Sequence, residues 1–551
     1  MTPITSFKAL LFITISLLSI NQIDAQNLEE NIDALIRSTY KTNEPGASIL
    51  IAKNGKTIYK KAFGLANLEL NVPMTSDHVF EIGSITKQFT AVSILMLEEQ
   101  GKLNLTDNIT KFIPDYPTQG KTITIHHLLN HTSGIKSYTS MLQFKALARK
   151  DMMPTQIIDV FKNEPMDFDP GEKFLYNNSG YILLGYIIEV VSKQTYEEFI
   201  ETHIFKKLGM ASSFYGNKTE LINNRASGYS KPGKTYVNAD YLSLTLPYAA
   251  GAIMSTVDDL LIWQNAIVKN KLIKKASLEK AINGSQLNNG KQIPYGYGWV
   301  KNTINGSLSY QHGGGIFGFT TMGVYLPEED VFVSGLTNCN CKNINTLVTK
   351  IAAIAINKPY PTKKDVIKLS NEEKKKWVGS YELDNGLFVY ITLKNGQLYR
   401  HKDGDKEKKI FPISSEKFIL NGGLVSYSFF KKDGKKHVKF KGRSNELLGV
   451  EVDKPAPKAK KEITLPSNIL KQYVGKYELH PSFIIEITLN NNKLFGQATG
   501  QPKFEMFAEN ESTFFLKVVP AIINFNKKDD GSIKSLILHQ NGKDIEGKKF
   551  E

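Results

Sequence analysis

Ser84 and Lys87 have the residue types and the spacing of a nucleophile and its base. They lie in the stretch E-I-G-S-I-T-K-Q-F-T-A-V-S-I-L-M-L-E-E-Q (residues 81–100), whose apolar residues recur at helical spacing and predict a buried helix of about five turns. Ser84 then stands at the helix start, where free N–H groups can stabilise an oxyanion. Lys87 follows one turn later on the same face, and burial can remove its proton so that it activates the serine.

The S-x-x-K spacing by itself is weak support for catalysis. It recurs in this chain at Ser133/Lys136, Ser277/Lys280, Ser414/Lys417 and Ser428/Lys431. The alternative for any single match is a capping serine followed by a solvated lysine. The context favours Ser84, because Gly83 permits a tight turn immediately before it and the helix that follows is apolar nearly all round.

Tyr176 and Asn178 form a second candidate group, in F-L-Y-N-N-S-G-Y. We expect a turn over residues 177–180 and an apolar helix from Tyr181, so that both side chains sit on a loop held by a core helix. A lysine ammonium nearby would lower the pKa of Tyr176 and let its phenolate act as base. Asn178 could donate to a substrate carbonyl or hold Lys87. The alternative for Tyr176 is a boundary aromatic with its hydroxyl in water.

A run of glycines follows His312, at Gly313-Gly314-Gly315, beside a predicted strand. Glycines there let a substrate backbone approach closely and can present N–H groups to an oxyanion. The alternative is a plain glycine turn. His131, in H-T-S-G, is a tempting base, but a turn histidine bonded to backbone is the better interpretation.

Strand patterns lie at both ends of residues 30–356 and helical patterns lie between them. Residues 47–53 and 56–63 read as strands joined by Asn54-Gly55, a hairpin signal, and residues 319–325 and 331–337 read as strands near the other end. The order predicts one sheet built from the two ends of this region.

The three motifs, Ser84-x-x-Lys87, Tyr176-x-Asn178 and His312-x-Gly314, occur in the order found in the serine hydrolase superfamily of class C β-lactamases, D-Ala-D-Ala carboxypeptidases and D-aminopeptidases. The chain resembles this superfamily over roughly residues 30–356, including the words F-E-I-G-S-I-T-K-Q-F-T-A, L-L-N-H-T-S-G-I and H-G-G-G-I-F-G-F. The resemblance implies an α/β (α+β) β-lactamase/transpeptidase-like sandwich, with an antiparallel sheet and a helical lobe.

The resemblance also implies roles. Ser84 is expected as nucleophile, Lys87 and Tyr176 as the base system, and Asn178, His312 and Gly314 as substrate contacts. The N–H groups of Ser84 and Gly315 are expected to form the oxyanion hole. Which of Lys87 and Tyr176 accepts the proton stays open at this point.

One departure from the class C enzymes affects the expected activity. The chain has no K-T-G, the motif those enzymes carry on this strand, and His312-Gly-Gly resembles the peptidase and esterase branches instead. We therefore expect hydrolysis of a small amide or ester, first of all a D-amino-acid peptide, by a D-aminopeptidase or DD-carboxypeptidase type of enzyme. The alternatives are a carboxylesterase or weak β-lactamase of the same fold, and a penicillin- or peptidoglycan-binding protein with little turnover.

The remainder of the chain repeats itself. W-V-G-S-Y-E-L (377–383) matches Y-V-G-K-Y-E-L (473–479), and I-T-L recurs at the same offset. Both copies alternate apolar and polar residues, which predicts two small antiparallel β-barrel-like domains. The expected divisions are a signal peptide (1–25), the hydrolase domain (26–356), a linker (357–369), the first β domain (370–452), a second linker (453–462) and the second β domain (463–551).

Composition and the N-terminal segment bear on location and partners. Lys8 and an apolar run before Ala25 predict a secretory signal and an exported protein, periplasmic or extracellular, with no stable membrane span after its removal. The net charge of +15 comes largely from lysine without an Arg-rich aromatic patch, so no nucleic acid is expected, while peptidoglycan is a candidate partner. We expect no cofactor and no metal. An exported protein could oxidise its two cysteines, Cys339 and Cys341, but we expect no disulfide, since i,i+2 positions along one strand rarely meet disulfide geometry; two cysteines are too few for a zinc site, and a structural role is expected.

Overall fold

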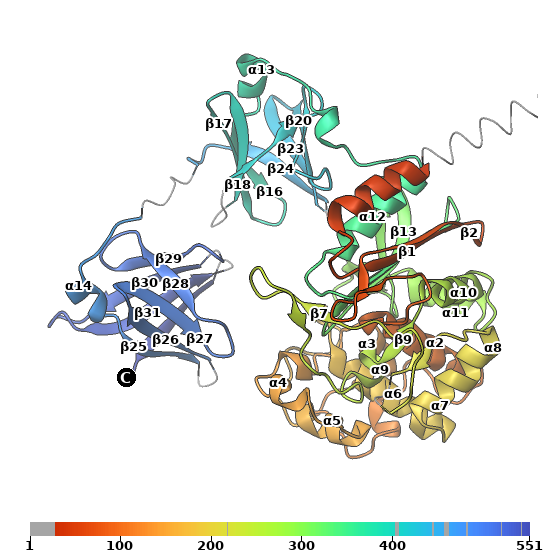
Figure 1. Ribbon diagram of the computed structural model, residues 1–551. Helices are drawn as coiled ribbons and strands as arrows, with labels where there is room; N and C mark the ends of the chain where they lie inside the picture. The colour runs from red at the N-terminus through yellow and green to blue at the C-terminus, as the bar shows by residue number, and fades with distance from the viewer. Residues whose placement is uncertain are drawn as a thin grey trace, which may run out of the picture. The chain divides into compact units, whose positions relative to one another are not determined.

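Strands from the beginning and the end of residues 1–359 meet in one antiparallel sheet, as the computed structural model of the chain shows (Figure 1). The central pairing joins β1 to β15, from Ala47 opposite Thr337 to Lys53 opposite Val331. The prediction of one sheet built from both ends is confirmed. In sheet order the strands are β12 (Val300–Ile304), β13 (Ser307–Ile316), β14 (Phe319–Leu326), β15 (Val331–Thr337), β1 (Ala47–Lys53) and β2 (Lys56–Phe63).

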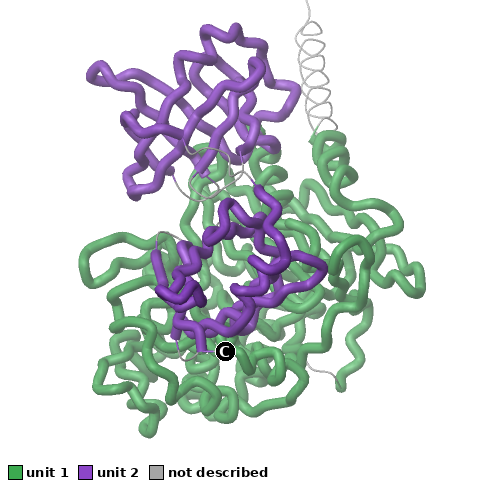
Figure 2. Tube along the Cα trace, turned by 90° about the vertical axis from the view of Figure 1, so that its left-hand side faces the viewer, with its two compact units in different colours: residues 1–359 green, residues 360–551 purple. Residues whose placement is uncertain are grey.

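The structure describes residues 28–216, 219–402, 407–442, 446–456, 462–480, 483–519, 521–540 and 543–550. The predicted signal peptide therefore lies outside the described residues, as does half of the predicted second linker, residues 457–461. The chain divides into two compact units, residues 1–359 and residues 360–551 (Figure 2). In the part that is described, no helix combines the length and the apolar character needed to cross a bilayer.

Helices cover both faces of the six-stranded sheet. Successive residues of a strand point to opposite faces, and Ile49 and Gly335 face α12 (Ile344–Ala355), which packs on β14 and β15. Leu50 and Leu336 point the other way, into the large core that includes Trp263 of α10 (Val257–Val268). This is the layered arrangement of a sandwich.

The helical region lies between β5 and β12 in sequence and contains most of this core (Figure 1). Its long members are α2 and α6, which contact each other. Its helices are α2 (Thr86–Glu99), α3 (Ile125–Leu129), α4 (Phe144–Leu147), α5 (Pro154–Phe161), α6 (Asn178–Ser192), α7 (Tyr196–Ile200), α8 (Lys206–Leu208), α9 (Tyr248–Gly251), α10 and α11 (Lys275–Ile282), with the short turns η1 (Gly83–Ile85), η2 (Ile109–Lys111), η3 (Tyr138–Ser140) and η4 (Glu201–Phe205).

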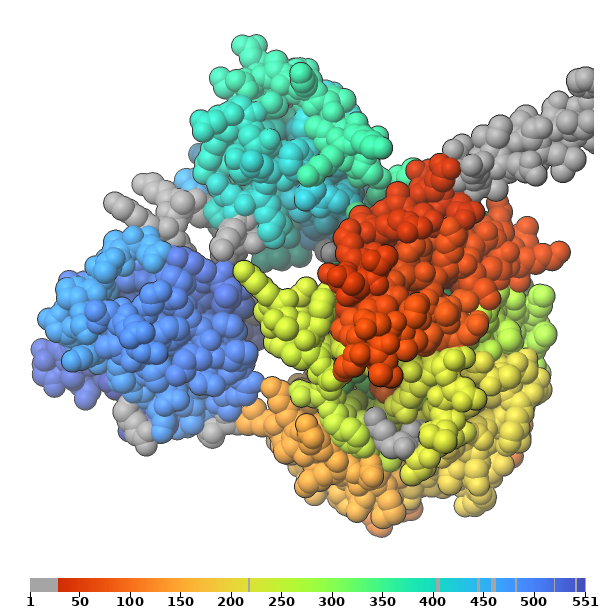
Figure 3. All heavy atoms as spheres, in the orientation of Figure 1, coloured from red at the N-terminus to blue at the C-terminus, as the bar shows by residue number. Residues whose placement is uncertain are grey.

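Short strands complete the first unit, and the hairpin of β7 and β8 stands out from its surface (Figure 3). β5 and β9 pair just before the Ser84 turn and so fix its entry. The short strands are β3 (Leu65–Asn67), β4 (Val72–Pro73), β5 (Phe80–Glu81), β6 (Phe214–Tyr215), β7 (Tyr229–Ser230), β8 (Val237–Asn238), β9 (Ile253–Ser255), β10 (Ser285–Gln286) and β11 (Gln292–Ile293).

Cys339 and Cys341 form a disulfide, which corrects the sequence-based expectation. The expectation assumed that both residues lie on one extended strand. In the structure β15 ends at Thr337 and the chain turns, which brings the two Cα atoms to 5.1 Å, within the usual range for a disulfide.

The second unit contains two antiparallel β structures, as the sequence repeat predicted. The first is a nine-stranded sheet that curls back on itself, because its two edge strands, β19 and β20, are separated in sequence only by Ile410. After η5 (Lys363–Asp365) and α13 (Asn371–Lys375), its strands are β16 (Gly379–Leu383), β17 (Phe388–Lys394), β18 (Gln397–Lys402), β19 (Lys408–Lys409), β20 (Phe411–Pro412), β21 (Lys417–Ile419), β22 (Ser426–Lys432), β23 (Lys435–Lys441) and β24 (Glu446–Val452).

The second β structure is a closed barrel that follows α14 (Ser467–Lys471). The repeat extends to single hydrogen bonds. The hydroxyl of Tyr381 donates to the Trp377 carbonyl at 2.9 Å, and that of Tyr477 donates to the Tyr473 carbonyl at 2.8 Å. The barrel strands are β25 (Gly475–His480), β26 (Phe483–Asn490), β27 (Lys493–Ala498), β28 (Phe504–Ala508), β29 (Thr513–Leu516), β30 (Ala521–Lys527), β31 (Ile533–Gln540) and β32 (Lys543–Lys549).

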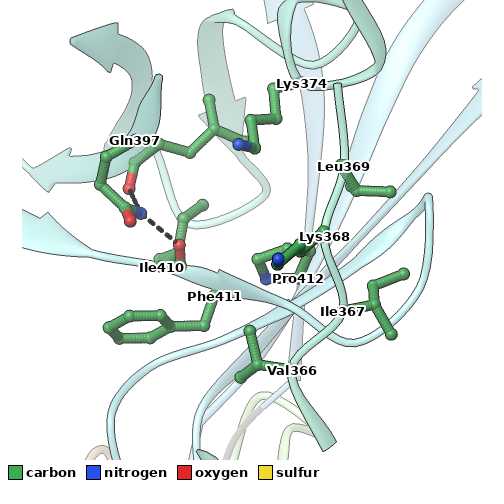
Figure 4. A pocket seen from close by; sticks show the side chains of 10 residues that line it. Val366, Ile367, Lys368, Leu369, Lys374, Gln397, Ile410, Phe411 and Pro412 are labelled. Atoms are coloured by element: carbon green, nitrogen blue, oxygen red, sulfur yellow. Dashed lines mark hydrogen bonds between the residues drawn. The ribbon is translucent and has the colours of Figure 1, made fainter. Parts of the chain in front are cut away.

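A cavity of about 340 Å³ opens in the first β structure, between residues 366–369 and strands β18 and β20 (Figure 4). Most of its lining is aliphatic or aromatic, with Gln397 bonded to the backbone carbonyls of Leu398 and Ile410. Its lining contains no serine, so the predicted chemistry is not located there.

Candidate active site

Ser84 lies on a tight turn between β5 and α2. The sequence placed Ser84 at the start of a helix, and in the structure β5 extends to Glu81, η1 spans Gly83–Ile85 and α2 continues from Thr86. Gly83 adopts φ +53°, and a Cβ built there would lie 3.0 Å from the Gly315 nitrogen. Glycine is needed at this position for its conformation and for the close approach of β13 to the turn.

Lys87 is fully buried, and its amine is held on three sides. It contacts the Asn178 Oδ1 atom at 2.8 Å, the Ala250 carbonyl oxygen at 2.9 Å and the Ser84 Oγ atom at 3.3 Å. Burial lowers the pKa of Lys87 to about 7, because an ammonium ion loses its hydration there. A substantial fraction of the amine is therefore neutral near pH 7.

The two acceptors of Lys87 come from two other helices. Ala250 belongs to α9, and the hydroxyl of Thr90 on α2 donates to the neighbouring Ala249 carbonyl at 2.7 Å. Asn178 is the first residue of α6, whereas the sequence predicted a turn there and a helix only from Tyr181. The helix starts earlier because Asn177 caps it, accepting a hydrogen bond from the Gly180 N–H at 2.9 Å.

Tyr176 lies beside both Ser84 and Lys87. The Lys87 amine is 4.9 Å from the centre of the Tyr176 ring, and Ser84 lies close enough to the Tyr176 hydroxyl to affect the pKa of the phenol. One side of Tyr176 is open to solvent, with 36% of the residue surface exposed, while the hydroxyl end is buried. Burial raises the pKa of Tyr176, and the neighbouring Ser84 hydroxyl only partly opposes this rise. The expected lowering of its pKa is therefore wrong, because the loss of phenolate hydration outweighs the nearby amine.

His312 lies within β13 together with the three glycines, so the glycine run is extended strand and not a turn. Its Nδ1 atom is 2.7 Å from the Gly313 carbonyl oxygen, which can only accept, so Nδ1 carries the proton. The hydroxyl of Tyr295 lies 2.9 Å from Nε2 and donates to it. Burial and the charge of Lys87 lower the pKa of His312 to about 4. This histidine is neutral at pH 7, with both ring nitrogens engaged.

The glycines of β13 bring the strand against the Ser84 turn. A Cβ on Gly314 would lie 1.9 Å from the Ile82 carbonyl oxygen, whereas a Cβ on Gly315 would meet nothing within 4 Å. The Thr321 hydroxyl on β14 donates to the same Ile82 carbonyl at 2.8 Å and fixes the turn from the sheet side. Gly315 consequently lies beside the turn that carries Ser84.

The structure thus gathers Ser84, Lys87 and Asn178 into one hydrogen-bonded group with the Tyr176 ring beside Lys87, Gly314 and Gly315 against the Ser84 turn and His312 on the same strand as these glycines. His131 is the backbone-bonded turn histidine that the sequence favoured: its Nδ1 atom accepts from the Asn177 N–H at 3.1 Å. Across the described ranges no three metal-ligating side chains gather.

Sequence reasoning missed three contributors to this group. Ala250 acts through its backbone carbonyl, for which no residue type could give a signal. Thr139, whose hydroxyl accepts from the Asn178 side chain at 3.0 Å, stands in an inconspicuous loop. Tyr295 opens Y-G-Y-G-W (295–299), in which no pattern of residue types points to catalysis. Ala250 contacts Lys87, Thr139 contacts Asn178 and Tyr295 contacts His312, and no short sequence motif contains both members of any of these pairs.

The sandwich fold and this serine–lysine–tyrosine group define a serine hydrolase of the β-lactamase and penicillin-binding type. Comparison with known proteins agrees. The family model described as Beta-lactamase matches residues 26–351, and the chain belongs to this family. A second model, described as Domain of unknown function (DUF3471), matches residues 459–549.

Individual relatives extend the comparison beyond the hydrolase domain. Penicillin-binding protein 4* of Bacillus subtilis (strain 168) is 32% identical over 430 residues, covering 73% of this chain and 94% of the relative. Among solved structures, the octameric penicillin-binding protein homologue from Pyrococcus abyssi is 27% identical with a TM-score of 0.54, covering 77% and 99% of the two chains. The D-stereospecific amidohydrolase from Streptomyces sp. is 25% identical with a TM-score of 0.51, covering 59% and 96%.

Proposed function

We propose that this protein hydrolyses a small amide or ester through an acyl-enzyme on Ser84, with D-amino-acid peptides and amides as the preferred substrates. The observation that carries the proposal is the set of contacts around Lys87. A neutral amine has two N–H bonds and one lone pair. The carbonyl oxygens of Asn178 and Ala250 each accept one N–H, which leaves the lone pair for the Ser84 hydroxyl proton.

The reaction then proceeds in two stages. The Lys87 amine takes the Ser84 proton while the Oγ atom bonds to the substrate carbonyl carbon. The oxyanion that forms is proposed to accept hydrogen bonds from the N–H groups of Ser84 and Gly315. The proton passes from Lys87 through the Tyr176 hydroxyl to the leaving nitrogen or oxygen, whose bond to carbon breaks. Water then cleaves the acyl-enzyme by the same proton path in reverse.

The base is thereby assigned to Lys87, with Tyr176 as a proton relay. The lowered pKa of Lys87 makes its amine available near neutral pH, whereas the raised pKa of Tyr176 keeps its phenol protonated. A phenol can still receive one proton while giving another, as a relay requires.

The state of His312 supports a neutral substrate over a carboxylate-ended one. A free carboxylate at the leaving end would require a cation, but His312 is neutral with both nitrogens engaged. This favours the aminopeptidase or amidase type over the DD-carboxypeptidase type. The Streptomyces relative, named a D-stereospecific amidohydrolase, supports the preference for D-residues.

A penicillin-binding protein with slow turnover is the second candidate, because the Bacillus relative carries that name. It would share the acylation of Ser84 and differ only in the rate at which water releases the acyl group. Under this second candidate function, peptidoglycan would be the binding partner.

The test begins with intact mass after incubation with a fluorophosphonate, alongside Ser84→Ala. One adduct on the wild-type protein and none on the variant is the expected result; no adduct on folded wild-type protein would overturn the proposal. D- and L-aminoacyl anilides, short esters and a chromogenic cephalosporin then separate the substrates. Rapid turnover of D-anilides supports the amidase, and a long-lived cephalosporin adduct without turnover supports the penicillin-binding alternative.

We further propose that the mature protein is exported and begins after Ala25. The support is the sequence of residues 1–25. Determining the N-terminal residue of protein isolated from the native host tests this, and an intact N-terminus would contradict it.

A further inference from the structure

Thr139 stands at the end of the hydrogen-bond chain that reaches Lys87. Its Oγ1 atom accepts from the Asn178 Nδ2 group at 3.0 Å, while the Asn178 Oδ1 atom accepts from Lys87 at 2.8 Å. The hydroxyl of Ser137, 3.1 Å from that of Thr139, accepts the Asn178 backbone N–H at 3.2 Å. The amide of Asn178 is thus held at its backbone and at its nitrogen end.

The turn that carries Thr139 is itself rigidly attached to the core. Thr139 lies in η3, where the N–H of Tyr138 donates to the Ser179 hydroxyl on α6 at 2.9 Å. The buried Tyr138 hydroxyl donates to the Leu246 carbonyl at 3.0 Å. The Thr139 hydroxyl therefore has a fixed position relative to the start of α6.

An amide side chain has two orientations that exchange its oxygen and its nitrogen. In the observed orientation the oxygen of Asn178 accepts an N–H of Lys87. In the opposite orientation the NH₂ group of Asn178 would face Lys87 and donate to its lone pair. That lone pair would then be turned away from Ser84.

We propose that Thr139 is a positioning residue: its hydroxyl donates to the Ser137 oxygen, so that toward Asn178 it can only accept, and this selects the amide orientation that directs the lone pair of Lys87 at Ser84. The proposal rests on the proposed function, since it concerns the same acylation step. The titratable groups that face Lys87 are Tyr176, Tyr181, His131 and His312. They affect the protonation of Lys87 in both orientations of the Asn178 amide, and the orientation of the amide adds its own effect.

Thr139→Val tests the proposal, because it removes the hydroxyl and keeps the shape of the side chain. The rate of Ser84 labelling by a fluorophosphonate should fall roughly three- to tenfold, the effect of one hydrogen bond on the two amide orientations. When the labelling rate is measured against pH, the rate falls on the acidic side as Lys87 becomes protonated. The midpoint of this fall should move to lower pH in Thr139→Val, since an NH₂ group facing Lys87 disfavours the ammonium form. Thr139→Ser, which retains the hydroxyl, should restore both.

The matched control is Thr349→Val on α12, which removes a hydroxyl that donates to the Asn345 carbonyl of its own helix. It should label like the wild type. Equal rates and midpoints for Thr139→Val and the wild type would overturn the proposal, and so would equal defects in Thr139→Val and Thr139→Ser. Should Thr139→Val not fold, Thr139→Ala removes the same hydroxyl and is judged by the same criteria. Absence of labelling in the folded wild type would instead show that the proposed function has failed, and this inference with it.

Discussion

The acylation of Ser84 should depend on pH through the protonation of Lys87. Burial lowers the pKa of this lysine to about 7, from an ordinary value of 10.5. Only the neutral amine can take the serine proton, so the acylation rate should be constant above the pKa and fall about tenfold per pH unit below it. Between pH 9 and pH 5 the expected decrease is about a hundredfold, because roughly 1% of the amine is neutral two units below its pKa.

A fluorophosphonate suits this measurement because it does not titrate in this range. The pH dependence of the labelling rate therefore comes from groups of the protein. The second-order labelling rate is determined by intact mass from pH 5 to pH 9, for the wild type and for Tyr176→Phe. If Lys87 is the base, Tyr176→Phe should be slower but keep its midpoint near pH 7. A rate that still rises tenfold per unit at pH 9 would refute the reasoning, because it would indicate an unperturbed lysine or a tyrosine base.

Four further predictions follow from the same structure. Gly314→Ala should abolish Ser84 labelling and lower the melting temperature, while Gly315→Ala should fold and label normally, because a Cβ clashes with a backbone carbonyl at the first position and meets nothing at the second. Asn177→Ala should reduce the free energy of unfolding by about 2 kcal/mol in urea titrations, through loss of the α6 cap and of a side-chain bond to backbone. The free energy of unfolding of the wild type, compared with that of Lys87→Met, should rise by about 1.4 kcal/mol per pH unit from pH 7 to pH 10. The reason is that Lys87 is neutral in the folded protein and takes up a proton on unfolding throughout that range. Free energies of unfolding that change in parallel with pH for the two proteins would contradict this. Residues 1–359 expressed alone should still label at Ser84, because all described contacts of the candidate site lie within this unit, and loss of labelling by a folded fragment would show that the β domains contribute to the site.

Local patterns in the sequence predicted much of the fold and the identity of the candidate residues. The Asn54-Gly55 hairpin formed as expected because both residues adopt the positive φ that such a turn requires. The repeat at Trp377 and Tyr473 predicted two related β structures. Similar local sequences form the same local contacts in both, such as the tyrosine hydroxyl that donates to the backbone carbonyl four residues earlier. Ser84, Lys87, Tyr176 and Asn178 were recognisable because nucleophile, base and amide are residue types with distinctive chemistry at short spacings.

Other features depended on contacts between residues far apart in the chain. The Lys87 amine meets the Asn178 oxygen and the Ala250 carbonyl only because α2, α6 and α9 pack together, and no local pattern encodes that geometry. Burial, which raises the pKa of Tyr176 where the sequence suggested a fall, is likewise a property of the assembled core. The amino-acid sequence by itself determined which groups are available for chemistry, whereas the tertiary structure decided their hydration and their partners, and hence which of them can act as the base.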